Sequence, residues 1–158
     1  LVAPDLPPGY QLVPGSELTE ATIQTYDARH EATPRPLFLH EWLGRPAGKV
    51  MVILNKAGDC CGYGYIRPCL LPDEAGQGWR LGPVIADSTL LAGALLDTLL
   101  SDRQGMVLID VPEVNQAAIY LLEERGFELD LLNLRMYKGT PPDLPLEDVY
   151  GLACLELG

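Results

Sequence analysis

Apolar residues along this chain recur in two patterns, one typical of strands and the other of helices. Short runs that are continuously apolar, or that alternate with polar residues, are typical of β-strands. Residues 49–55 (KVMVILN) are a clear run of this kind, and residues 105–111 (GMVLIDV) resemble a strand that is buried on both faces. Seven strands are expected, at residues 10–14, 49–55, 60–68, 79–87, 105–111, 128–137 and 149–157.

Four segments have apolar positions three and four residues apart, as one face of a helix requires. The first begins after Ser16 or Thr19, because either is a suitable N-cap, and it ends before Pro34. Asp87 or Ser88 is the expected N-cap of the third. The other helices are expected at residues 37–43, 88–101 and 112–125.

The order of these elements predicts a mixed α/β (α+β) fold. Only residues 79–125 follow a strand–helix–strand–helix order, which makes the two strands in this segment parallel. We therefore expect a mostly antiparallel sheet of about seven strands, with one parallel pair at its centre and about four flanking helices. Residues 1–9 contain three prolines and read as a linker or N-terminal arm, so residues 10–158 form the single expected domain.

The net charge of the chain limits the classes of partner that it is expected to bind. It has 22 acidic residues against 11 Lys and Arg, giving a formal net charge of −11 at pH 7. A field of that sign argues against nucleic acid as a partner. No apolar run approaches the roughly 18 residues that a membrane-spanning helix needs, so a soluble protein without a membrane partner is expected.

The cysteines and histidines predict neither a disulfide framework nor a metal site. Cys60 and Cys61 are adjacent, and no CxxC pair or zinc-type histidine spacing is present. His30 and His40 have no neighbouring ligand at a suitable spacing, so surface or satisfied histidines are expected. Reduced, buried thiols suggest a cytoplasmic protein.

Four stretches carry a resemblance to a known family. They are CGYGYIR (61–67), LGPVIAD (81–87), VLIDVPEVNQAAIYLLEERGF (107–127) and NLRMYKG (133–139). With the order of elements, they resemble the GNAT superfamily of N-acetyltransferases over nearly the whole chain. The segments LGPVIAD, DVPEVNQAA, LRMYKG and LELG are more narrowly similar to the C-terminal acetyltransferase-like domain of tandem GNAT proteins, which implies an upstream GNAT domain in a longer parent chain.

The resemblance implies acetyl-CoA as the cosubstrate, without a metal. In this fold two parallel strands diverge, and the pantetheine arm of coenzyme A fills the wedge between them. Here the wedge would lie between residues 81–85 and 108–111, with the pyrophosphate at the helix that begins after Ser88. The residues expected to bind the cofactor are Leu81, Gly82, Val84, Ile85, Ser88, Thr89, Leu90, Ile109, Val111 and Asn115.

The implied reaction is attack of a neutral amine, from a small molecule or a lysine-like side chain, on the thioester. Asp110 is the candidate general base, with a helix cap as its alternative role. Tyr120 is a candidate acid, although it lies two residues from the usual tyrosine position. Tyr63, Tyr65 and Arg35 are candidates for contacting the substrate; the tyrosines alternatively form core, and Arg35 alternatively pairs with Asp27.

Two departures from the family pattern keep a second function open. The usual Q/R-x-x-G-x-G/A loop is missing, and Asp87 places negative charge where phosphates would sit. Leu122 occupies the usual tyrosine position. The alternative is therefore a catalytically silent GNAT-fold domain that supports an upstream acetyltransferase domain or binds a metabolite or protein partner. The oligomeric state is left open.

Overall fold

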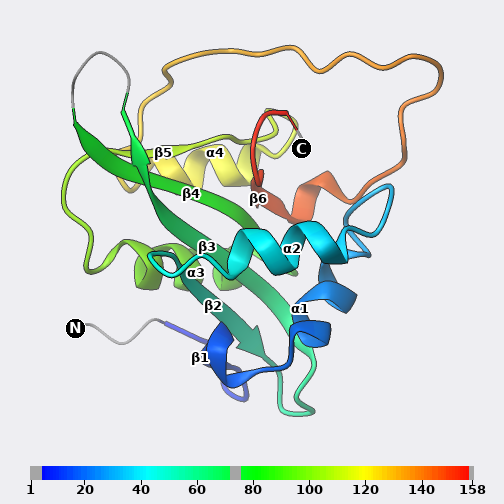
Figure 1. Cartoon of the computed structure of the whole chain (residues 1–158), viewed down its shortest axis with the longest axis vertical. Helices are drawn as coiled ribbons and strands as arrows, with labels where there is room; N and C mark the ends of the chain where they lie inside the picture. The colour runs from blue at the N-terminus through cyan, green and yellow to red at the C-terminus, as the bar shows by residue number, and fades with distance from the viewer. Residues whose placement is uncertain (1–4, 72–75, 157–158) are drawn as a thin grey trace.

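The computed structural model describes residues 5–71 and 76–156, which form a mixed sheet of six strands (Figure 1). The sheet order is β1-β2-β3-β4-β5, and β6 also pairs with β4. Only the pairing of β4 with β5 is parallel, which confirms the expected parallel pair; β5 ends the strand order, so the pair lies at one side of the sheet and not at its centre. The strands are β1 (Gln11–Pro14), β2 (Lys49–Leu54), β3 (Cys60–Leu70), β4 (Gln77–Ala86), β5 (Val107–Ile109) and β6 (Val149–Gly151).

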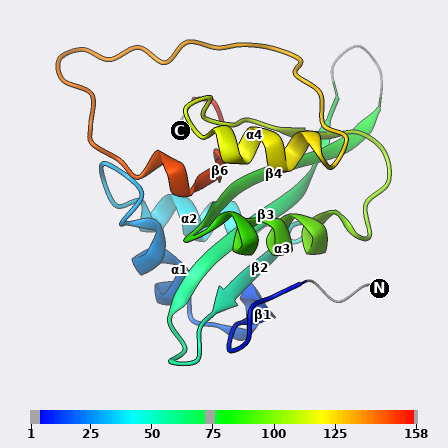
Figure 2. The ribbon, with the colours of Figure 1, turned by 180° about the vertical axis from the view of Figure 1, so that it is seen from behind.

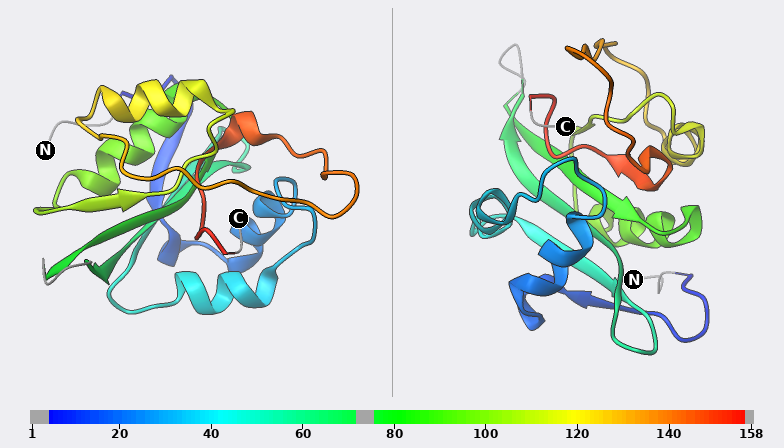
Figure 3. Two further views of the ribbon diagram at one scale, coloured as in Figure 1. Left: turned by 90° about the horizontal axis from the view of Figure 1, so that it is seen from above. Right: turned by 90° about the vertical axis from the view of Figure 1, so that its right-hand side faces the viewer.

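Helices cover both faces of the sheet, which confirms the predicted α/β class. Helices α1 and α2 lie on one face of the sheet, and α3 and α4 lie on the opposite face (Figures 1 and 3). No helix in the described part of the chain is long and apolar enough to cross a bilayer. The helices are α1 (Glu20–Asp27), α2 (Pro36–Leu43), α3 (Thr89–Leu100) and α4 (Gln116–Glu123), with short 3-10 turns η1 (Gly15–Glu17) and η2 (Leu146–Asp148).

The larger apolar core lies between the sheet and the α3–α4 layer. Leu91, Leu95 and Leu99 project from one side of α3 and are buried, as the sequence predicts. Burying each such leucine contributes about 1.5–3 kcal/mol. A smaller core lies under α1, where Ile23 and Tyr26 pack with Tyr63 of β3.

Several predicted boundaries are too wide. Helix α1 begins at Glu20 with Thr19 as N-cap, and Ser16 lies in the 3-10 turn η1 instead. Strand β5 has three residues, and α4 begins at Gln116 with Asn115 as N-cap. Ser88 caps α3 as expected, because its hydroxyl accepts a hydrogen bond from the Leu91 amide.

The predicted strand at residues 128–137 is wrong. These residues have no regular secondary structure and make no backbone hydrogen bond to the described parts of the chain. They belong to a long segment that arches away from the body of the molecule between α4 and η2 (Figures 1 and 2). Leu134 is 93% exposed and Met136 89% exposed. The alternating pattern is present, but no neighbouring strand pairs with it.

The final predicted strand, at residues 149–157, is also much shorter than expected. Strand β6 ends at Gly151, and the chain beyond it turns without further ladder pairing among the described residues. Its place in the sheet decides what the candidate site can hold.

Candidate functional site

Strands β4 and β5 diverge, as the resemblance implies. Their parallel pairing runs from Trp79 opposite Val107 to Leu81 opposite Ile109 and then stops. Beyond Leu81, β4 continues for five more residues to Ala86. A wedge therefore opens between the end of β4 and the residues that follow β5.

Strand β6 fills that wedge. It pairs antiparallel with Val84 and Ile85 of β4. The other edge of these β4 residues is taken by β3, so β6 lies on the edge that faces the wedge. On its far side, the Leu152 amide donates to the Asp110 carbonyl oxygen at 2.8 Å. The C-terminal segment thus bridges the two diverging strands.

Glycines allow this close approach. Gly82 has φ +143°, and a Cβ placed there would lie 2.0 Å from the Leu152 carbonyl oxygen. A Cβ at Gly151 would lie 3.0 Å from the Ile109 side chain. Any larger residue at position 82 would collide with backbone that has no room to move. The wedge is therefore closed by tight backbone contact.

Asn115 fixes the same segment. Its side-chain oxygen accepts from the Ala118 amide at 3.0 Å and caps α4. Its amide nitrogen donates to the Glu147 and Val149 carbonyl oxygens, each at 2.9 Å. With 4% exposure, Asn115 has both donors and its oxygen committed inside the chain.

The candidate base, Asp110, is held in an ion pair, and the candidate acid, Tyr120, faces solvent. Asp110 follows β5 and forms an ion pair with Arg80 of β4. It does not cap α4, because the N-cap is Asn115, so the alternative role is wrong. Tyr120 is 65% exposed on the outer side of α4, whereas Leu122 is buried. Tyr120 therefore faces solvent.

At the start of α3, the Ser88 side chain already occupies one of the helix amides. The Ser88 hydroxyl accepts from the Leu91 amide at 3.4 Å. Thr89 Oγ1 lies 3.0 Å from the hydroxyl of Tyr150 in β6, and Leu90 is 52% exposed. Asp87 stands directly before these residues. Its carboxylate would repel a phosphate placed there.

A buried polar group, which we call the Asp27 group, joins α1, β3 and the residue before α2. The fully buried Asp27 carboxylate accepts two hydrogen bonds from Arg35, each 2.9 Å, and one from the Tyr63 hydroxyl at 2.5 Å. Burial alone would lower the pKa of Arg35, but the hydrogen bonds and charge of Asp27 leave it raised. Burial also raises the pKa of Tyr63, so its phenol stays protonated and donates.

This geometry confirms the predicted Asp27–Arg35 pair and gives the tyrosines core positions. Arg35 and Tyr63 are both held by Asp27. Tyr65 is fully buried, and its hydroxyl has no hydrogen-bond partner among the described residues. None of the three candidate substrate residues lies on an open surface in this form.

A separate cavity of about 460 Å³ lies between α1, α2 and the first two strands. None of its lining residues is one predicted to bind the cofactor or the acceptor. They are Pro14, Gly15, Ser16, Leu18, Glu20, Ile23, Gln24, Leu39, His40, Leu43, Gly44, Gly48, Lys49, Val50 and Met51.

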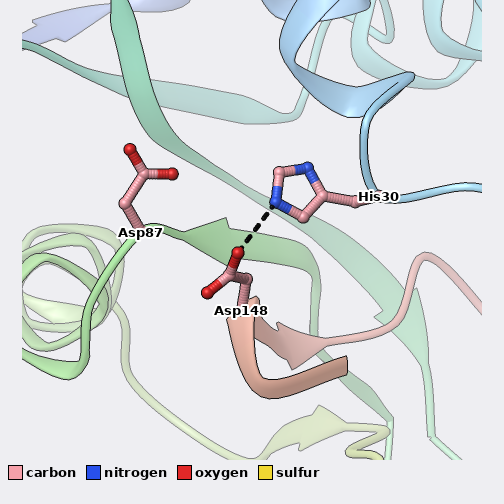
Figure 4. Close-up of side chains that lie close together, drawn as sticks. All are labelled: His30, Asp87 and Asp148. Carbon is pink, nitrogen blue, oxygen red and sulfur yellow. Dashed lines mark hydrogen bonds and ion pairs between the residues drawn. The ribbon is translucent and has the colours of Figure 1, made fainter. Parts of the chain in front are cut away.

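The sequence analysis missed one polar cluster altogether. His30 follows α1, Asp87 follows β4, and Asp148 ends η2, yet one potential ligand atom from each lies within 4.8 Å of the others (Figure 4). Because the three residues are far apart in the sequence, no local spacing marks them.

Solved structures with the same architecture are acetyltransferases. A putative acetyl transferase from Pyrococcus furiosus matches with TM-score 0.62 and 16% identity, covering 82% of this chain and 99% of that one. Glucosamine-6-phosphate N-acetyltransferase from Arabidopsis thaliana matches with TM-score 0.58 and 13% identity, covering 81% and 97%. An aminoglycoside antibiotic 6'-N-acetyltransferase from Acinetobacter baumannii matches with TM-score 0.61 and 9% identity, covering 84% and 100%. At these identities the likeness establishes the fold.

The sequence itself establishes the family. Residues 23–151 match the family model described as "Acetyltransferase (GNAT) domain". The chain therefore belongs to the GNAT acetyltransferase family. No curated protein sequence matches it.

Members of this family use acetyl-CoA, but the residues predicted to hold it do not fit that group in this structure. The β4 edge that would bind a pantetheine arm is paired with β6 at Val84 and Ile85. The Asn115 side chain is bound to the same C-terminal segment. The wedge has the shape that the family implies, but the chain itself fills it.

Proposed function

We propose that this chain is a GNAT-fold domain that does not transfer acyl groups in the form described here and supports an acetyltransferase domain upstream in a longer parent chain. The observation that carries this proposal is the insertion of β6 between β4 and the end of β5. A cofactor arm would have to replace backbone hydrogen bonds that the chain already makes, and removing such partners costs about 0.5–1.5 kcal/mol each.

The remaining chemistry supports the same proposal. Asp110 is paired with Arg80, and Leu122 stands where the family has its acid. The glycine-rich phosphate loop is absent from the sequence, and Asp87 adds a repelling charge at that place. Each difference removes a different part of acyl transfer: cofactor binding, proton removal and proton return.

Residues 128–137 are the surface proposed to contact the acetyltransferase domain. Exposed apolar side chains gather in this segment, including Leu129, Leu131 and Leu134. An exposed apolar stretch of this kind marks an interaction site more often than a free surface. Its strand-like pattern suits pairing with the edge of a sheet in the partner domain.

The second candidate is an acetyl-CoA-dependent N-acyltransferase that acts on a small or side-chain amine by direct attack on the thioester. It is favoured by the family match and by the divergence of β4 and β5. The net charge of −11 would attract a cationic amine. This candidate requires β6 to leave β4 before the cofactor enters.

Acetyl-CoA titration of the full chain and of Asn115→Asp separates the two candidates. The substitution keeps the oxygen that caps α4 but puts an acceptor against the Glu147 and Val149 carbonyl oxygens, which releases the C-terminal segment. Gln116→Glu adds the same charge one residue away, at an exposed position, and is the matched control.

Calorimetry of the wild-type chain should show no binding up to about 1 mM acetyl-CoA, a concentration that would reveal even a weak complex of about −4 kcal/mol. If Asn115→Asp also fails to bind, the silent domain is supported. Binding by the variant alone supports an acyltransferase closed by its own C-terminal strand. Micromolar binding by the wild-type chain would overturn the first proposal.

A further inference from the structure

We propose that His30, Asp87 and Asp148, here called the His30 group, bind one divalent transition-metal ion such as Zn²⁺. Figure 4 shows the three side chains approaching one another from the ends of α1, β4 and η2. Among the residues that the structure describes, this is the only set of three or more His, Cys, Asp or Glu side chains brought this close. One imidazole and two carboxylates are a donor set that suits zinc or manganese.

The orientation of His30 is that of a metal ligand. Its Nδ1 lies 3.0 Å from the main-chain carbonyl oxygen of Tyr26. A carbonyl can only accept, so Nδ1 carries a proton, and Nε2 is the ring nitrogen that faces the group. Metal-bound histidines are held in this way by a second hydrogen bond from the other ring nitrogen. His30 is 4% exposed, so packing fixes this orientation.

The separation between His30 and Asp148 also fits an ion. Nε2 and Asp148 Oδ2 are 3.3 Å apart and form a hydrogen bond without one. Two ligands on a tetrahedral zinc ion with bonds of about 2.0–2.1 Å lie roughly 3.3 Å apart. The observed distance therefore equals the edge that the metal would impose.

Tyr26 positions the third ligand. Its hydroxyl donates to Asp87 Oδ1 at 2.7 Å. A single residue thus orients His30 through its carbonyl and Asp87 through its side chain.

The group lacks a cation from the chain itself. In the described part of the protein, no Lys or Arg forms an ion pair with Asp87 or Asp148. A divalent ion would neutralise both carboxylates. Asp87 is exposed and Asp148 is 29% exposed, so a fourth coordination position would face solvent.

The ion would act on the strand that closes the wedge. Asp148 is the residue directly before β6, whereas His30 and Asp87 belong to the ends of α1 and β4. Coordination would tie β6 to the sheet end where it inserts. This inference concerns the metal site alone, and its test does not depend on acetyl-CoA binding.

Calorimetric titration of the metal-free full chain with ZnCl₂ tests the site. We expect one ion per chain with a micromolar dissociation constant, and at least a tenfold weakening in His30→Gln, in Asp148→Asn and in Asp87→Asn. Asp87 is exposed and its asparagine still accepts from Tyr26, so this variant tests the site even if the other two fold poorly. His40→Gln is the matched control, because His40 pairs with Glu20 at 2.8 Å outside the group.

Co²⁺ in place of Zn²⁺ reports the ligand class. The visible absorption of a Co²⁺ complex with nitrogen and oxygen ligands should appear in the wild-type chain and in His40→Gln, and should be lost in Asp87→Asn. A thiolate charge-transfer band would assign the ion to cysteine and overturn the proposal. So would the absence of binding at 1 mM Zn²⁺, or an affinity unchanged in all three ligand variants.

Discussion

Two groups of polar side chains at the end of α1 use similar residues but differ in burial and in whether they contain a permanent cation. In the Asp27 group, a buried carboxylate is matched by the Arg35 guanidinium and a tyrosine hydroxyl. In the His30 group, two carboxylates face one imidazole, with a tyrosine hydroxyl on Asp87. The first contains a permanent cation, Arg35, which also pairs with Glu31 at 3.0 Å, and its Asp27 carboxylate is fully buried. The second is open on one side and short of positive charge.

The difference teaches how to separate a structural site from a binding site in one protein. A buried ion pair loses stability when its cation is removed, because the partner charge stays buried and uncompensated. An unbalanced group at a surface tolerates neutralisation of a carboxylate and gains stability from an added cation. The same substitution should therefore have opposite consequences in the two groups.

Removing Arg35 should have the largest effect. Arg35→Met leaves the Asp27 carboxylate, which has no exposure, without its cation. Breaking a buried pair in this way costs about 3–5 kcal/mol of unfolding free energy. Urea unfolding followed by circular dichroism measures the loss.

The double variant Arg35→Met with Asp27→Leu is the control for this prediction. Replacing both charges by apolar residues removes the uncompensated charge, so part of the lost stability should return, although the buried Tyr63 hydroxyl loses its acceptor. A single variant that loses less than about 1 kcal/mol would show that the Asp27 group is not the balanced structural pair described here.

Releasing the segment that carries Asp148 should have the next effect. Asn115→Asp removes two hydrogen bonds to the Glu147 and Val149 carbonyl oxygens. With about 1 kcal/mol for each bond, the unfolding free energy should fall by about 2 kcal/mol. Hydrogen exchange of the Leu152 amide, which donates to Asp110, should speed up more than exchange in α3. Equal change in both places would mean global rather than local loosening.

Most of the fold follows from local patterns in the sequence. Strands β1 to β4 and helix α3 lie where alternation, apolar runs and the Ser88 cap predict them. The Asp27–Arg35 pair was also predicted, because the two residues bracket the junction between α1 and α2. Elements with strong local patterning need little help from distant contacts.

The features that the sequence did not predict all depend on contacts between distant segments. Residues 128–137 have the pattern of a strand, but a strand forms only when an edge is available to pair with it. The insertion of β6 depends on the close approach of Gly82 and Gly151 to neighbouring segments, which a pattern of side chains does not encode. The His30 group joins three distant positions, so no spacing in the sequence predicts it.

Neutralising a carboxylate in the His30 group should have a small effect when metal is absent. Asp148→Asn removes one of two negative charges, and the position is partly exposed. The unfolding free energy should change by no more than about 0.5 kcal/mol in buffer with a chelator, as for most surface substitutions. Thermal unfolding with and without Zn²⁺ gives the comparison: the wild-type chain should be stabilised by the ion and the variant should not. A loss of several kcal/mol without metal would make the His30 group structural.

The exposed ion pair of His40 with Glu20 should give the smallest effect, and it serves as a reference for the buried His30. His40 lies 2.8 Å from Glu20, and the hydrogen bond and charge of that carboxylate raise the pKa of His40 above its usual value of 6.5. Because the folded-state pKa is raised, the stabilisation is fully present below pH 6.5 and is lost as the pH rises through the pKa of the folded chain. An NMR titration should show the His40 pKa falling toward 6.5 in Glu20→Gln and in high salt, since both groups are exposed. Addition of Zn²⁺ should shift the His30 resonances and leave those of His40 unchanged; equal shifts would remove the distinction between the exposed pair and the His30 group.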